Sequence, residues 1–109
     1  MYEFGDVLLA KVQFPNGTSV KKRPVIVLFQ KKKNIIVSGI TSNISRDGVL
    51  IKKESGLKKD SIVRLDYIFT LDDSLIEKKL ISLSENKKRE ICELLQENIC
   101  GNFFLRRNK

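Results

Sequence analysis

The sequence predicts a mainly β fold that ends in one helix, arranged as a small antiparallel barrel or a strongly curved sheet. Two observations support this prediction. The first three quarters of the chain contain six short segments rich in β-branched and other apolar residues, separated by short turns. From Ser84 onward, apolar residues recur at helical spacing instead. With 109 residues, the chain fits a single domain that spans residues 1–109.

The first two strands flank a loop rich in turn residues. We expect a strand over Val7–Phe14, because its residues are mostly apolar, and a loop over Pro15–Ser19. Val25–Phe29 is expected to be a buried strand because of its β-branched content. Pro24 is expected at the first position of that strand, where the missing backbone N–H costs least.

A lysine-rich turn over Lys31–Asn34 separates the second strand from the third, and Asp72–Glu77 is expected to form one short helical turn between later strands. The strands expected after the lysine-rich turn are Ile35–Ile40, Gly48–Ile51, Ile62–Phe69 and Leu80–Leu83.

The C-terminal helix has both a start signal and an apolar side. Ser84 is a good N-cap, and Gly101 is a residue type that often ends a helix. We therefore expect a helix between them that lies across one face or mouth of the barrel. The apolar side is formed by Ile91, Leu94, Leu95 and Ile99.

Composition excludes several functional classes. Histidine is absent, which removes His-dependent triads and nearly all zinc sites. Cys92 and Cys100 lie eight residues apart in the expected helix, about 12 Å along its axis, too far to form a disulfide with each other. The longest uninterrupted apolar run is Val25–Phe29, far below the ~20 residues of a membrane span. We expect a reduced, cytoplasmic protein without a membrane segment.

The net charge of +8 and the pI near 9.7 make a polyanion the first partner to consider. The lysines occur mostly in doublets, and each doublet is also explained by a solvated turn. The six arginines are more informative, because Arg23 and Arg64 sit at strand edges beside apolar runs. A planar guanidinium suits phosphate oxygens where geometry matters.

Several segments together resemble the MazF/PemK toxin family. They occur in the family's order, at compatible spacings, and the resemblance runs from Gly5 to the terminal helix. The segments are Gly5-Asp6-Val7, Lys22-Arg23-Pro24-Val25-Ile26-Val27-Leu28, Gly39-Ile40-Thr41-Ser42, and Ser61-Ile62-Val63-Arg64-Leu65-Asp66 continuing to Thr70-Leu71-Asp72.

This resemblance implies an SH3-like barrel that forms a homodimer, cleaves single-stranded RNA without a metal or other cofactor, and is inhibited by a small antitoxin protein. Arg23 and Thr41 resemble the family's arginine and threonine that face the scissile phosphate. Arg64 and Asp66 are similar to the arginine and aspartate that PemK-like members place at the same pocket. These four are the predicted catalytic residues.

The implied chemistry needs a base that removes the proton of a ribose 2′-OH, which then attacks the adjacent phosphorus. Asp66 is the predicted base, since an arginine with a pKa above ~12 is poorly suited to accept a proton near pH 7. Arg23 and Arg64 would stabilise the transition state and Thr41 would hold a phosphate oxygen. The residues predicted to contact substrate are Lys22, Ser42, Asn43, Phe14 and Thr18.

Each of these residues also has a structural interpretation. Asp66 could pair with Arg64 on the same strand face, and Thr41 could simply end a strand with a hydrogen bond to the backbone. Phe14 and Phe69 could stack on bases or belong to the barrel core. A metal site built from the acidic residues between positions 66 and 77 is disfavoured, because most of them lie in the expected short turn.

The sequence departs from the family at two points. Gly17-Thr18-Ser19-Val20 lacks the glutamate that commonly follows the loop glycine, and the histidine that some PemK-like members carry near the first strand is absent. The alternative function is therefore a catalytically inactive SH3-like module that binds RNA or a protein partner.

Overall fold

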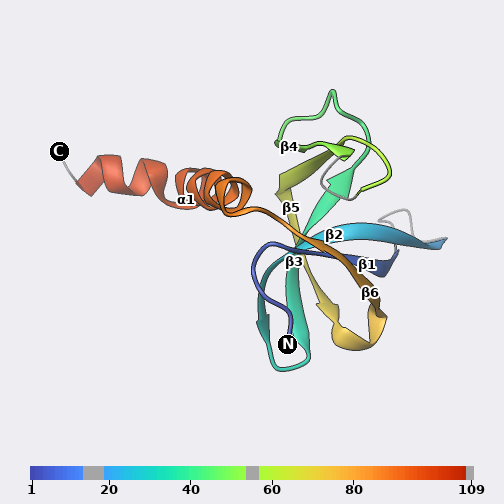
Figure 1. Ribbon diagram of the computed structural model, residues 1–109. Helices are drawn as coiled ribbons and strands as arrows, with labels where there is room; N and C mark the ends of the chain where they lie inside the picture. Colours follow the sequence, from blue (N-terminus) through green and yellow to red (C-terminus); the bar gives the residue numbers. More distant parts are fainter. Residues whose placement is uncertain (14–18, 54–56, 108–109) are drawn as a thin grey trace.

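Six strands form one antiparallel sheet in the order β4-β5-β3-β2-β1-β6, and the sheet curls into a half-open barrel (Figure 1). The computed structural model describes residues 1–13, 19–53 and 57–107. The elements are β1 Asp6–Gln13, β2 Val20–Lys31, β3 Asn34–Thr41, β4 Val49–Ile51, β5 Ser61–Asp72, the 3-10 turn η2 Asp73–Leu75, β6 Ile76–Ser82 and α1 Glu85–Arg107. The predicted fold class is confirmed, and each of the six predicted strands overlaps an observed one. The predicted helical turn over Asp72–Glu77 is shorter than expected: Asp72 ends β5 and Ile76 begins β6, so only Asp73–Leu75 are helical.

The inner strands bury both of their faces, which explains their nearly continuous apolar sequence. On β1, Val7 belongs to one hydrophobic cluster and Leu8 to another. On β2, Ile26 joins the first cluster while Val25 and Val27 join the second. The first cluster includes Ile91 and so lies between the sheet and the start of α1, while the second joins residues of β1, β2, β3 and β5.

Strand β2 begins earlier than predicted. It starts at Val20, so Pro24 lies inside the strand rather than at its first position. The strand tolerates proline there because β3 pairs with β2 only from Val25 onward, opposite Gly39. On that side Pro24 therefore lies at a sheet edge, where a missing N–H breaks no ladder hydrogen bond.

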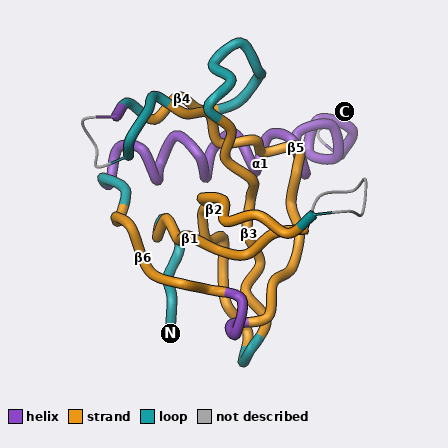
Figure 2. Tube along the Cα trace, turned by 90° about the vertical axis from the view of Figure 1, so that its right-hand side faces the viewer, coloured by secondary structure: helices purple, strands orange, loops and turns teal. Residues whose placement is uncertain are grey.

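Register shifts curve the sheet. They interrupt the pairing of β1 with β6, of β2 with β3, and of β3 with β5 between Ser38 and Gly39. Each extra residue bends its strand and increases the local twist. The strands therefore wrap around the interior instead of forming a flat layer (Figure 2).

Helix α1 begins as predicted but ends later. The Ser84 hydroxyl accepts a hydrogen bond from the Lys87 N–H at 3.3 Å, which confirms Ser84 as the N-cap. The fully buried Ile91 anchors the first half of the helix on the sheet. The helix continues past Gly101 to Arg107, because one glycine costs only about 1 kcal/mol and no proline follows it. Its second half projects away from the sheet (Figure 1), so the prediction that it lies across the barrel is right only for the first half.

The Asp6 carboxylate links β1 to the N-terminal segment and to β6. It accepts hydrogen bonds from the Glu3 N–H at 2.9 Å and the Ser82 hydroxyl at 2.9 Å, and the Lys79 ammonium lies 3.1 Å away. Burial raises the pKa of Asp6, but these hydrogen bonds and the Lys79 charge outweigh it and hold the pKa below its usual value. The charge on this carboxylate therefore fastens the edge strand β6 to β1.

No helix in the described part of the chain is long and apolar enough to cross a membrane. Phe14 and Thr18, both predicted to contact substrate, lie outside the described residues.

Candidate active site

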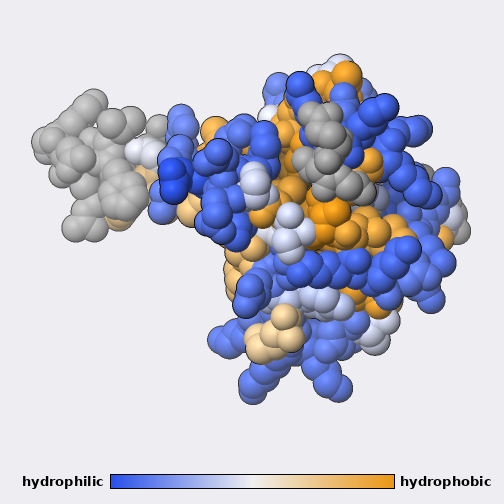
Figure 3. Space-filling view, viewed as in Figure 1, coloured by the Kyte–Doolittle hydropathy of each residue, from blue (hydrophilic) through white to orange (hydrophobic). Residues whose placement is uncertain are grey.

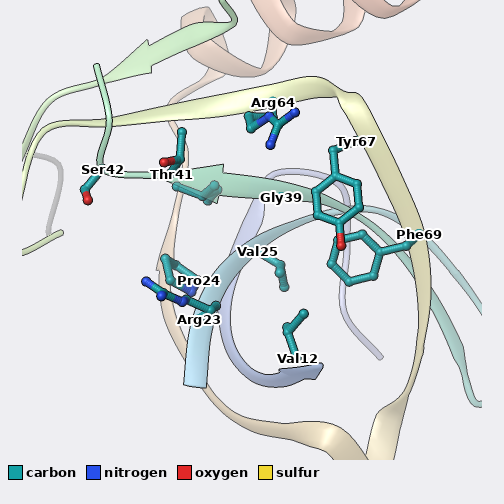
Figure 4. Close-up of a pocket in the computed structure, with 11 residues that line it drawn as sticks. Val12, Arg23, Pro24, Val25, Gly39, Thr41, Ser42, Arg64, Tyr67 and Phe69 are labelled. Atoms are coloured by element: carbon teal, nitrogen blue, oxygen red, sulfur yellow. The ribbon is translucent and has the colours of Figure 1, made fainter. Parts of the chain in front are cut away.

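A cleft of about 200 Å³ opens where β1, β2, β3 and β5 come together beside the end of β3 (Figure 4). Its polar lining comes from Arg23 on β2, from Thr41 and Ser42 at the end of β3, and from Arg64 on β5. Tyr67 and Phe69 form its aromatic wall, and Val12, Pro24, Val25, Gly39 and Ile40 complete it. Of the described residues that line the cleft, none is acidic.

Arg23 reaches the cleft because of where β2 changes neighbours. It pairs with Ala10 of β1, but the pairing of β2 with β3 starts only two residues later at Val25. Beyond that point β2 and β3 separate, and Arg23 is exposed beside the gap. Figure 4 shows its guanidinium across the cleft from the aromatic wall.

Thr41 is held by the loop that follows β3. Its hydroxyl oxygen accepts a hydrogen bond from the Asn43 N–H at 3.1 Å. The Asn43 side chain in turn accepts hydrogen bonds from the Ser45 N–H at 3.2 Å and the Ser45 hydroxyl at 2.6 Å. This bond occupies a lone pair of the Thr41 oxygen, so the hydroxyl proton can still be donated to an anion.

Arg64 is fixed on two sides. Its Nε and Nη2 atoms each lie 3.3 Å from an oxygen of Asp66, and its guanidinium lies 5.5 Å from the centroid of the Tyr67 ring. The hydrogen bond from Arg64 lowers the pKa of the Asp66 carboxyl below its ordinary value. Asp66 is therefore ionised at neutral pH, and it holds the guanidinium in one orientation.

The aromatic wall depends on a glycine. The rings of Tyr67 and Phe69 lie 4.7 Å apart between centroids. A Cβ atom at Gly39 would come within 2.7 Å of the Tyr67 ring, so the absence of a side chain lets the ring pack against β3. Sequence reasoning considered Phe69 and missed Tyr67. Its position one residue after Asp66, on the strand that carries Arg64, was the available signal.

The structure brings together four of the predicted site residues: Arg23, Thr41, Ser42 and Arg64. Asp66 does not line the cleft but is attached to it through Arg64. The predicted structural pairing of these two residues is thus present. Lys22 points elsewhere, since its ammonium lies 2.7 Å from the Glu77 carboxylate on β6.

Asn43 also lies outside the cleft lining, where it positions Thr41. Within the described residues, no three cysteine or carboxylate side chains gather into a group that could hold a metal ion.

Comparison with known proteins gives consistent results. A family model described as PemK-like, MazF-like toxin of type II toxin-antitoxin system matches residues 3–99. The chain is 32% identical over 115 residues to an endoribonuclease MazF of Staphylococcus epidermidis, covering 95% of this chain and 96% of that protein.

Among solved structures, the fold is similar to the Mycobacterium tuberculosis toxin MazF-mt6, with a TM-score of 0.67 and 21% identity. That alignment covers 84% of this chain and 93% of the other. A structure of an Mtb toxin is similar at a TM-score of 0.66 and 18% identity, covering 84% and 97% of the two chains.

Proposed function

The chain belongs to the PemK-like, MazF-like toxins of type II toxin-antitoxin systems, and we propose that it cleaves single-stranded RNA, including mRNA, at selected sequences without a metal ion. The observation that supports this most directly is the meeting of Arg23, Arg64 and Thr41 around one cleft with no acidic lining residue. Two guanidinium groups and one hydroxyl are suited to a phosphodiester anion.

The reaction proposed here is an internal transfer followed by release of the downstream strand. Asp66, which lies beside the cleft and is joined to its lining through the ion pair with Arg64, accepts the proton of the ribose 2′-OH, and the oxygen attacks the adjacent phosphorus. The bond from phosphorus to the 5′-oxygen breaks, and that oxygen takes a proton from solvent water and leaves as a 5′-hydroxyl, while Asp66 returns its proton to solvent. The upstream product keeps a 2′,3′-cyclic phosphate. DNA lacks the attacking oxygen and is not a substrate.

The polar groups of the cleft have distinct roles in this scheme. Arg23 and Arg64 neutralise the negative charge that grows on the phosphoryl oxygens, and Thr41 donates a hydrogen bond to one of them. Ser42 contacts the substrate beside Thr41, and Asn43 acts through Thr41. We keep Phe14 and Thr18 as proposed substrate contacts from the sequence. Lys22 would contact substrate only by leaving its ion pair with Glu77.

The proposal also includes the setting in which this activity operates. We propose that the protein is a homodimer in the cytoplasm and that a cognate antitoxin protein inhibits it. The net charge of +8 is compatible with RNA and with an acidic protein segment as partners.

Cleavage of a long RNA transcript in the presence of EDTA tests the proposed function. We expect discrete fragments with a 2′,3′-cyclic phosphate and a 5′-hydroxyl, and we expect cleavage to stop when the ribose upstream of the cut is replaced by deoxyribose. An inactive binding module would contain the same ion pair between Arg64 and Asp66, so the cleavage assay must distinguish the two functions. If the protein binds RNA but leaves it intact with and without EDTA, the inactive module is the correct function. If the deoxy-substituted strand is still cut, the mechanism is wrong.

A further inference from the structure

A second cavity, of about 420 Å³, adjoins the cleft on the side away from the aromatic wall. The two cavities share Arg23, Pro24, Ile40 and Ser42 as lining residues. A strand whose phosphate lies between Arg23 and Arg64 would therefore extend directly into this second cavity in one direction. We call it the basic pocket, because three lysines line its rim.

The basic pocket has a rim of lysines. Lys58 and Lys59 come from the segment before β5, and Lys78 comes from β6. Within the part of the chain that the structure describes, none of these three takes part in an ion pair. By contrast, the neighbouring Lys22 and Lys79 are each bonded to a carboxylate. Among the described residues, no carboxylate therefore lies within ion-pair distance of these three ammonium groups.

The floor of the basic pocket is apolar. Leu9, Leu57 and Leu80 line it, and each is only partly buried. In Figure 3, hydrophobic surface occupies the middle of the visible face between two bands of hydrophilic side chains. An apolar floor below a cationic rim matches a nucleotide, which has a flat base and a phosphate. The volume lies within the range of pockets that hold small ligands.

We propose that the basic pocket binds the nucleotide next to the scissile phosphate, with Lys58 and Lys59 on its outer phosphate and the three leucines against its base. This inference rests on the proposed function, because it takes RNA as the ligand. The shared Arg23 favours RNA over an acidic protein segment, since one continuous strand would fill both cavities. The pocket would then help to select the base beside the cut.

Binding of a non-cleavable RNA tests the proposal independently of catalysis. The probe is a short strand centred on a cut site, or on any preferred binding sequence, with deoxyribose at the central position. The variant is Lys58→Gln with Lys59→Gln. The matched control is Lys31→Gln with Lys32→Gln, an exposed doublet at the β2–β3 turn, outside all the cavities described.

We expect the Lys58/Lys59 variant to bind about tenfold more weakly than the control, with the salt-dependence slope reduced by about 0.7, because the two lysines neutralise one phosphate. Replacing single phosphates by methylphosphonates adds a position-specific readout. One flanking phosphate should weaken wild-type binding when neutralised and have less than a twofold effect in the variant. Removing the base of that nucleotide should weaken binding by both proteins.

Two results would overturn the assignment. One is a Lys58/Lys59 variant that binds like the control at every methylphosphonate position. The other is a variant that keeps RNA affinity but loses affinity for oligoglutamate, which would assign the pocket to an acidic protein segment. Circular dichroism checks that both variants fold. Failure of the proposed function would be seen separately, as an intact long transcript with the wild-type protein.

Discussion

Arg23 and Arg64 reach the same cleft in different ways. Arg64 is held between the Asp66 carboxylate and the Tyr67 ring, so its orientation is set before any substrate arrives. Arg23 is exposed at the point where β2 parts from β3. Arg64 is therefore a preorganised donor, and it contributes to transition-state binding because little reorganisation is needed during the reaction.

For Arg23, the geometry of the guanidinium should matter more than its charge. We expect Arg23→Lys to retain RNA binding and to lose about 10²-fold or more in cleavage rate, because lysine keeps the charge but not the planar fork. Single-turnover cleavage and binding of the deoxy-substituted strand measure the two effects. Arg89→Lys, on the exposed side of α1, is the control. A wild-type cleavage rate in Arg23→Lys would remove Arg23 from the catalytic group.

Asp66 has a pKa lowered by Arg64, and the direction of this shift predicts a pH profile. A base must be deprotonated, so cleavage should stay constant from neutral pH downward and fall only below the ordinary aspartate value of about 3.9. Asp66→Asn should lose about 10²-fold in rate and also lose this acidic limb. If the acidic limb persists in Asp66→Asn, another group titrates and Asp66 is not the base.

At the residue scale, the sequence could predict the groups that stand beside recognisable segments. Arg23, Thr41 and Arg64 each occupy a strand end or edge next to an apolar run, and the fold brings them to one cleft. Tyr67 could not be predicted in the same way, because its place in the wall depends on the register shift between Ser38 and Gly39. A local pattern carries no information about such a shift.

Two glycines within regular elements should respond to alanine in opposite ways. A Cβ at Gly101 would lie 3.6 Å from Glu97, an ordinary contact, so Gly101→Ala should stabilise the protein by about 0.5–1 kcal/mol through helix propensity. A Cβ at Gly39 would lie 2.7 Å from the Tyr67 ring, so Gly39→Ala should destabilise the protein and weaken cleavage. Urea unfolding of both variants tests this; equal effects on stability would contradict it.

The carboxylate of Asp6 should make the attachment of β6 sensitive to pH. Its pKa in the folded protein is lowered, so its contribution to stability is present above the unfolded-state value and is lost as pH falls through the folded-state value. We expect Asp6→Asn to cost about 1–3 kcal/mol at pH 7 and much less near pH 2. Urea unfolding at the two pH values measures the difference, and an equal cost at both would refute this role.

At the scale of elements, the sequence predicted the existence and type of each segment better than its ends. Pro24 and Gly101 are residue types that often mark a boundary, and both lie inside longer elements. In each case the surrounding structure decides whether the element ends at that residue. Strand β2 is unpaired with β3 at Pro24, and α1 tolerates the modest cost of one glycine at position 101.

The whole molecule leaves large apolar side chains in contact with solvent. Ile99 is 72% exposed on the projecting half of α1, and Phe29 is 56% exposed on β2. The proposed homodimer would remove such side chains from solvent. Light scattering at micromolar concentration should give twice the chain mass of 12.5 kDa. A particle of 12.5 kDa would show that the protein acts as a monomer.

Length and charge predicted a single basic domain, but not how its mass is distributed. The described chain extends 47 Å along its long axis and 30 Å along the other two, because half of α1 extends beyond the sheet. The apolar side of that helix was visible in the sequence. Which of its apolar residues pack against the sheet depends on where β4 and β5 end. The positions of these strand ends follow only from the assembled sheet.

The strands that line the cleft all lie inside the sheet. The lining comes from β1, β2, β3 and β5, while the edge strands β4 and β6 contribute none of it. Several of the stretches that line it, however, are paired on one side only: Val12 and Arg23 lie beyond the pairing with β6 and β3, and Phe69 pairs with β3 but lies beyond the pairing with β4. Local opening of these stretches therefore reaches the cleft before the sheet unfolds globally.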